Sequence, residues 1–241
     1  MKMLTTVTRA MAPTLYYLAK AYWLEQKHGT LPKAKRDAFI QAWGLETLLN
    51  LNVEITAEGR PDVSQPSILV GNHIGYLDIP LLCSQAPVLF LAKAELARWP
   101  LIGRACKLVD LVFVQRESMR SRQESIKAIV HKLQKMQENI VIFPSGTTSI
   151  DEEKKWQRGA FRIAKEHGIP VQPFRIHYNP LRPAAYIDDD SFIGQLHQLT
   201  KHKKIQASIS FHPPLQIADI ATDMENVRRW CIKPSQLPRQ P

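Results

Sequence analysis

Beyond residue 50, short apolar runs alternate with segments of helical periodicity, and this alternation restricts the chain to an α/β fold. The runs have the length of buried strands and are bounded by turn residues. They lie at 67–70, 88–92, 108–114, 140–143, 171–176 and 205–211, and helices are expected at 79–82, 121–137 and 158–167. Strands that alternate with helices predict a mixed, largely buried sheet flanked by helices.

The first fifty residues have a different pattern and predict two helices. Apolar residues recur at spacings of three and four across 6–26, and a second apolar helix follows Pro32. Tyr16, Tyr17 and Trp23 accompany lysines, a combination that suits the interface of an anionic membrane. Packing of both helices on the rest of the domain is the alternative. We expect a two-helix membrane-association segment at 1–50, a catalytic domain at 51–233 and a loose tail at 234–241.

The chain carries an excess of positive charge, with a formal net charge of +10. Such an excess favours an anionic membrane surface or nucleic acid as a partner, or else forms a solvated basic face. No nucleic-acid recognition motif accompanies the charge, so we expect no nucleic-acid partner. The uncharged stretch 10–19 is much shorter than the about 20 apolar residues of a membrane-spanning helix.

The cysteines indicate the compartment. Cys83, Cys106 and Cys231 are widely spaced and form no C-x-x-C pair, which predicts reduced thiols without a disulfide framework or a cysteine-rich metal site. With no convincing secretory signal, we expect a peripheral or monotopic protein on the cytoplasmic side of the cell membrane.

A candidate site lies at 71–78, Gly-Asn-His-Ile-Gly-Tyr-Leu-Asp, directly after an apolar strand. Catalytic groups of α/β folds gather where strands end. A histidine can act as a general base near neutral pH, and a carboxylate on its other ring nitrogen fixes the tautomer and stabilises the imidazolium. Residues five apart on a straight helix point about 140° away from each other. His73 and Asp78 therefore meet only if His73 lies in the turn and Asp78 on the following helix.

Two further polar segments follow predicted strands. Arg116 comes after 108–114, where a guanidinium can bind a phosphate or carboxylate, or form an ordinary surface ion pair. The loop 143–149, Phe-Pro-Ser-Gly-Thr-Thr-Ser, offers hydroxyls and backbone N–H groups of the kind that bind anions in turns. A plain strand-to-loop turn uses the same residue types.

In this order the segments resemble the glycerolipid acyltransferase family that includes 1-acylglycerol-3-phosphate acyltransferase. That family shows N-H-x4-D, an arginine after a strand, F-P-E-G-T-R-S and a proline-containing apolar strand. The resemblance implies phospholipid biosynthesis: acyl-CoA or acyl carrier protein donates a fatty acyl group to a lysolipid hydroxyl, without metal or bound cofactor. It implies His73 as the base and Asp78 as its partner. The residues implied for the acceptor site are Asn72, Arg116, Ser145, Gly146, Thr147, Thr148 and Ser149.

Two positions depart from the family pattern. Ser145 stands where the family has glutamate, and Thr148 stands where it has arginine. Loss of the arginine removes a charge-assisted contact to an acceptor phosphate, worth roughly 1.5–3 kcal/mol. Thr148 and the run 186–191 resemble the lyso-ornithine lipid acyltransferase branch. The expected acceptor is 1-acylglycerol-3-phosphate, which is converted to phosphatidic acid. The alternatives are lyso-ornithine lipid as the acceptor, or a non-catalytic membrane lipid-binding protein.

Overall fold

The computed structural model describes residues 2–29, 31–94, 103, 112–114, 119–150, 154–187 and 190–232. These residues form a seven-stranded sheet in the order β1-β7-β6-β2-β5-β3-β4. The strands are β1 Val53–Glu58, β2 Ile68–Gly71, β3 Leu89–Lys93, β4 Val112–Val114, β5 Ile140–Ile142, β6 Val171–Asn179 and β7 Ile205–Phe211. Neighbouring strands are parallel except β6 and β7, which are antiparallel. The predicted mixed sheet is confirmed.

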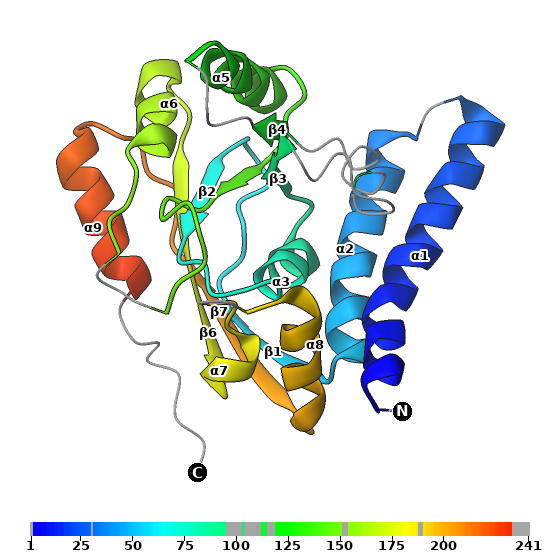
Figure 1. The fold of residues 1–241 in the computed structure, drawn as a ribbon. Helices are drawn as coiled ribbons and strands as arrows, with labels where there is room; N and C mark the ends of the chain where they lie inside the picture. The colour runs from blue at the N-terminus through cyan, green and yellow to red at the C-terminus, as the bar shows by residue number, and fades with distance from the viewer. Residues whose placement is uncertain are drawn as a thin grey trace.

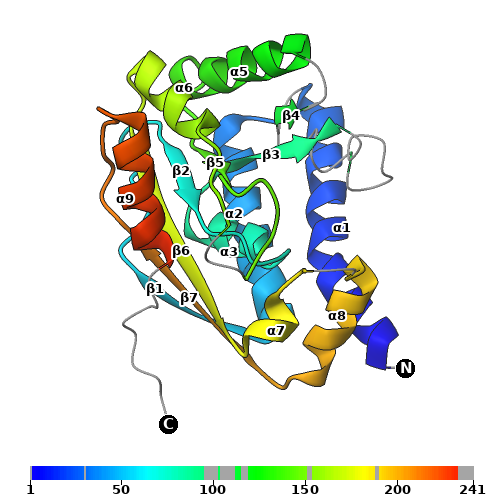
Figure 2. The ribbon, with the colours of Figure 1, turned by 60° about the vertical axis from the view of Figure 1, so that its left-hand side comes forward.

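Helices cover both faces of this sheet (Figure 1). The helices of the described segments are α1 Lys2–His28, α2 Lys33–Asn50, α3 Asp78–Gln85, α5 Met119–Gln134, α6 Gly159–His167, α7 Leu181–Ala184, α8 Phe192–Lys201 and α9 Ile220–Ile232. Helices α6 and α9 lie on one face, whereas α3 and α2 lie on the other with α1 outside them, as the turned view also shows (Figure 2). Helix α8 contacts α1.

The centre of the core is β2, whose residues Ile68, Leu69 and Val70 are fully buried. A strand covered on both faces has a continuous apolar sequence, and this is why the sequence predicted it. Strand β1 was not predicted, because it is an edge strand and Val53 alone among its residues is buried. Cys83 and Cys231 are buried free thiols, and burial raises the pKa of each above its ordinary value. Cys106 lies outside the described residues.

Helix α2 packs closely against α3. A Cβ atom at Gly44 would lie 2.6 Å from the carbonyl oxygen of Pro80, so the two helix backbones approach closely. At the other end of α2, buried Glu138 accepts hydrogen bonds from Arg36 at 2.5 Å and Lys33 at 3.0 Å. Burial alone would lower the pKa of Arg36, but its bonds to Glu138 and a neighbouring aspartate outweigh this and raise it.

Helix α1 packs on α2 through side-chain hydrogen bonds and keeps a row of aromatic rings exposed. Tyr17 donates to Glu46 at 2.6 Å, and Trp43 donates to Thr14 at 2.9 Å. The large exposed apolar side chains of α1 are Leu15, Tyr16, Tyr22 and Trp23. In the described segments, every helix is too short or too polar to span a membrane. The domain division stays a prediction, and the tail 234–241 lies outside the described residues.

Candidate active site

The site is built where β2 ends and α3 begins. His73 lies in the turn between them and Asp78 is the first residue of α3, the arrangement that the spacing required. The His73 Nδ1 atom lies 2.6 Å from Asp78 Oδ2. Gly75 makes the turn possible, since a Cβ atom there would lie 2.1 Å from the carbonyl oxygen of Ala184. The backbone N–H of Tyr186 in turn donates to the Ile74 carbonyl at 2.9 Å, which ties the turn to the segment after α7.

Asp78 is completely buried, and its carboxylate is held by four groups. Its Oδ2 atom accepts from the backbone N–H groups of Ile74 at 2.6 Å and Gly75 at 3.1 Å, besides its contact with His73. Its Oδ1 atom accepts from the hydroxyl of Tyr178 at 2.8 Å. A buried ionised carboxylate needs such donors, because unpaired burial of a charge is very unfavourable. The carboxylate is therefore fixed in place to orient the His73 ring.

Tyr178 was not predicted, although it contacts Asp78 directly. It lies on β6, one hundred residues later in the chain, and is itself fully buried. Burial raises its pKa well above the ordinary value, and the negative charge of Asp78 raises it further. Tyr178 is thus a permanent hydrogen-bond donor to the carboxylate at physiological pH.

The imidazole of His73 is held flat against Phe143. The ring centroids are 3.8 Å apart and the planes differ by 10°. The backbone carbonyl of His73 accepts from the N–H of Ser149 at 2.8 Å. With the Nδ1 proton directed at Asp78, the Nε2 atom carries the lone pair that can accept a proton. The His73 side chain is 17% exposed, so it is screened from bulk solvent but reachable.

The loop 143–149 lies against this turn. Some of its polar residues line a pocket, and others hold the loop in its conformation. Ser145 and Ser149 line a pocket that contains His73. The Thr148 hydroxyl donates to the Tyr186 carbonyl at 2.5 Å and so holds the loop to its neighbour. Gly146, with φ of +73°, shapes the turn. Thr147 accepts from the Ser145 hydroxyl through its carbonyl at 2.7 Å.

Asn72 has its side-chain amide engaged with the backbone of β6. It donates to the carbonyl of Ile176 and accepts from the N–H of Ile176, both at 2.8 Å. Asn72 therefore clamps the catalytic turn to the next strand, although it also lines the pocket. Arg116 lies outside the described residues. An acceptor-binding role for Asn72, Arg116 and the loop residues stays a prediction.

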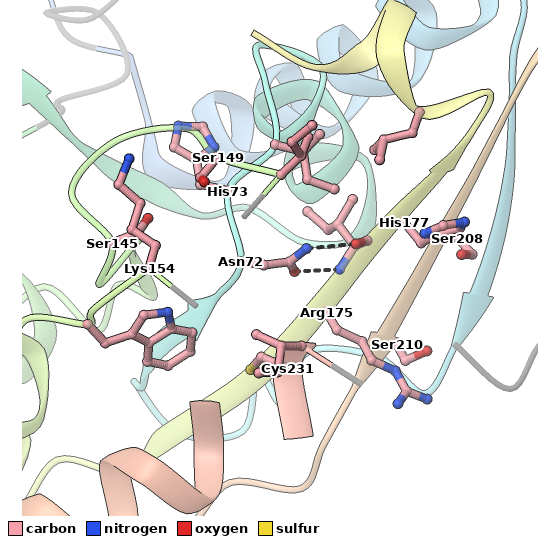
Figure 3. Close-up of a pocket in the computed structure, with 16 residues that line it drawn as sticks. Asn72, His73, Ser145, Ser149, Lys154, Arg175, His177, Ser208, Ser210 and Cys231 are labelled. Carbon is pink, nitrogen blue, oxygen red and sulfur yellow. Dashed lines mark hydrogen bonds between the residues drawn. The ribbon is translucent and has the colours of Figure 1, made fainter. Parts of the chain in front are cut away.

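The pocket extends from His73 to interior residues of β6 and β7 (Figure 3). Its lining contains polar residues that the sequence analysis did not select: Lys154, Arg175, His177, Ser208 and Ser210. The four strand residues alternate, two on β6 and two on β7, and thus point to one face of the sheet. A charged residue between buried residues of a strand, as Arg175 is, was the available signal.

Comparisons with known proteins identify the family of the chain. The family model described as Acyltransferase matches residues 51–177. A lyso-ornithine lipid O-acyltransferase of Pseudomonas aeruginosa is 28% identical over 256 residues, covering 100% of this chain and 97% of that protein. A 1-acyl-sn-glycerol-3-phosphate acyltransferase of Neisseria gonorrhoeae is 32% identical over 123 residues, covering 50% of this chain and 47% of that protein.

Among solved structures, the crystal structure of the 1-acyl-sn-glycerophosphate acyltransferase PlsC from Thermotoga maritima is similar. Its TM-score is 0.64 at 20% identity, and 95% of each chain is covered, so the two share a fold. The chain belongs to the acyltransferase family, and the relatives named here are O-acyltransferases that act on lysolipids. The resemblance identified from the motifs is therefore confirmed at the level of the family.

Proposed function

We propose that the protein transfers a fatty acyl group from an acyl thioester to the free hydroxyl of a lysolipid, with His73 as general base. The observation that carries this proposal is the His73–Asp78 pair, with its 2.6 Å contact and with His73 lining a pocket at the end of β2. The pair supplies a base and the group that orients it, but no protein nucleophile is needed, because the acceptor hydroxyl is itself the nucleophile.

The reaction follows from that geometry. The His73 Nε2 atom takes the proton of the acceptor hydroxyl as its oxygen attacks the thioester carbonyl. The tetrahedral intermediate collapses with cleavage of the carbon–sulfur bond, and the imidazolium returns its proton to the departing thiolate. An ester and a free thiol are formed, and His73 is neutral again. Asp78 stabilises the imidazolium through Nδ1 without leaving its own hydrogen bonds.

For the acceptor, we propose lyso-ornithine lipid. The relative that matches over the whole chain has this activity in its name. The loop 143–149 also carries no cation for a phosphate, and the Thr148 hydroxyl is directed at the Tyr186 carbonyl. Lysophosphatidate is the second candidate, supported by the shorter match to the Neisseria gonorrhoeae protein. Acyl-CoA and acyl carrier protein are the two candidate donors.

We also propose that α1 brings the site to the cytoplasmic face of an anionic membrane. The Tyr16 and Trp23 rings are more than half exposed. Lys20 and Lys27 lie over these rings, with the ammonium nitrogens 5.4 Å and 5.1 Å from the ring centroids. Aromatic rings beside lysines match a headgroup layer, where the rings enter the interface and the ammonium groups meet lipid phosphate.

An acyl-transfer assay in mixed micelles tests the proposal. Purified protein is given each donor with lyso-ornithine lipid, lysophosphatidate or lysophosphatidylcholine, and the product is identified by mass spectrometry. We expect the diacyl product to form fastest with lyso-ornithine lipid and to disappear with His73→Ala. Faster turnover of lysophosphatidate would replace the proposed acceptor, and no product with any acceptor and either donor would refute the activity.

A further inference from the structure

The pocket has a second polar end, one strand away from His73, and its main residue is Arg175. Strand β2 pairs with β6 in the register Gly71 to Phe174, and Asn72 is bonded to the backbone of Ile176. Arg175 therefore leaves the sheet beside the catalytic turn and lines the same pocket as His73. In Figure 3 its guanidinium lies by Ser210, on the opposite side of Asn72 from His73.

The guanidinium of Arg175 is held in place, and among the described residues no acid lies within hydrogen-bonding distance of it. Its central carbon lies 4.9 Å from the centroid of the Trp230 ring, so the indole holds one face of the group. Stacking leaves the N–H donors at the edge of the plane available. The Nε atom is buried and has no hydrogen-bond partner among the described residues. The nearest acid is exposed Glu58, whose Oε2 atom is 3.7 Å from Nη2, longer than a hydrogen bond.

The charges of the pocket favour an anion at this end. Its lining, taken over the described residues, contains no aspartate or glutamate. Arg175 is the labelled cation at this end, whereas Lys154 lies on the His73 side of Asn72 (Figure 3). A buried guanidinium N–H without an acceptor is costly unless a ligand or water supplies one. A planar pair of oxygens, as in a carboxylate or phosphate, fits the fork of donors that arginine presents.

We propose that Arg175 binds the anionic group of a substrate while the acceptor hydroxyl lies at His73; this inference rests on the proposed function. A lysolipid built on ornithine and acylated on one amine keeps a free carboxylate, which suits this position. A lysophosphatidate phosphate or a phosphate of the acyl donor has the same chemistry. Binding at Arg175 would fix the head group so that the acceptor hydroxyl reaches His73 Nε2. It would also give the unpaired Nε–H of Arg175 an acceptor.

Steady-state kinetics with Arg175→Gln test this subsite. We expect the KM for lyso-ornithine lipid to rise roughly 10- to 100-fold, the range for loss of hydrogen bonds to a charged group, with little change in kcat. The matched control is Arg162→Gln, which removes the same charge from an exposed side chain on α6 and should leave the KM unchanged. Arg175→Lys keeps the charge but not the fork, and it should give an intermediate KM. If circular dichroism shows that Arg175→Gln unfolds at a lower temperature than wild type, Arg175→Lys serves as the test variant instead.

The substrate whose KM changes in the Arg175 variants is the one that carries the anionic group. An effect that vanishes with the carboxylate methyl ester of the acceptor assigns the acceptor carboxylate, and an effect on lysophosphatidate alone assigns its phosphate. An effect on the KM of acyl-CoA alone assigns a donor phosphate. Folded Arg175 variants with all these KM values unchanged would overturn the subsite.

Equilibrium binding separates this inference from the proposed reaction. In the His73→Ala background turnover is expected to be too slow to disturb a titration, and lyso-ornithine lipid, lysophosphatidate and acyl-CoA are each titrated by calorimetry with and without Arg175→Gln. A loss of affinity for any of them with Arg175→Gln supports the subsite even if the intact protein transfers no acyl group. Equal affinities of the His73→Ala protein and the His73→Ala, Arg175→Gln protein for all three ligands would overturn the subsite, whatever the activity assay gives.

Discussion

The hydroxyl of Tyr178 offers a direct test of how the Asp78 carboxylate is held. Tyr178→Phe removes that hydroxyl and leaves the aromatic ring in the core. Asp78 Oδ1 then loses the donor at 2.8 Å, whereas the backbone N–H groups of Ile74 and Gly75 still hold Oδ2. Because both side chains are buried, water does not replace the lost donor without rearrangement.

The size of the effect follows from that contact. A hydrogen bond to a charged group contributes roughly 1.5–3 kcal/mol, which corresponds to a fall in Tm of about 3–12 °C for a domain of this length. If about 1.4 kcal/mol of the loss is felt in the transition state, through a less well oriented His73, kcat falls about tenfold. The KM for either substrate should change little, because Tyr178 is not among the residues that line the pocket.

The pH dependence of this stabilisation has a defined sign. The folded-state pKa of Tyr178 is raised above the ordinary 10.0 by burial and by Asp78. A group with a raised pKa stabilises the fold fully below its unfolded pKa and loses that contribution as the pH rises toward the folded value. The Tm difference between wild type and Tyr178→Phe should therefore be constant at neutral pH and shrink above about pH 10.

Calorimetry and steady-state kinetics check these values, with Tyr16→Phe as the control. Tyr16 is exposed on α1, where its hydroxyl accepts a 3.4 Å hydrogen bond from Lys20. Removing this hydroxyl should change the free energy of unfolding by less than about 0.5 kcal/mol, so the Tm should stay close to that of wild type. A Tyr178→Phe protein with the Tm and kcat of wild type would refute the reasoning, since the Asp78 carboxylate would then be fixed without that donor.

Three further substitutions have clear expected results. Gly75→Ala should abolish activity and lower Tm, because the added Cβ atom would lie 2.1 Å from a backbone carbonyl oxygen. The control is Gly159→Ala, whose added Cβ atom has no neighbour within 4 Å and which should be neutral or stabilising in a thermal melt. Glu138→Ala should cost about 1–3 kcal/mol in urea unfolding, because buried Arg36 loses one of its two carboxylate partners and keeps only Asp37; a cost below about 0.5 kcal/mol would contradict that. Trp23→Ala should weaken co-sedimentation with anionic liposomes, whereas Val63→Ala, an equally exposed apolar residue outside α1, should not; equal binding by both would refute docking through α1.

The predicted parts of the site are those that follow one another along the chain. His73 and Asp78 are five residues apart, and the turn and helix needed for their contact could be worked out from spacing. The loop 143–149 was found because it follows an apolar strand. Such local patterns predict where residues lie in the folded protein, because the carboxyl ends of parallel strands gather at one edge of the sheet.

The parts that were missed depend on contacts between distant segments. Tyr178 meets Asp78 across one hundred residues, and its β-strand continues beyond the apolar run that predicted β6. Arg175 lies between buried neighbours, and only the pairing of β6 with β2 places it in the pocket. A deletion of residues 1–50 would be an unsuitable test of membrane binding, because α2 packs on α3 at Gly44 and bonds Glu138 through Lys33 and Arg36.

The central claim is that His73 removes the proton from the acceptor hydroxyl, and a single-turnover experiment tests it most directly. Free thiol release from the acyl donor is followed at saturating lysolipid for wild type and for His73→Ala, with circular dichroism to verify folding. If His73 is the base, the rate should be roughly 10²- to 10⁴-fold lower in the variant. A folded His73→Ala protein that releases thiol at the wild-type rate would contradict it.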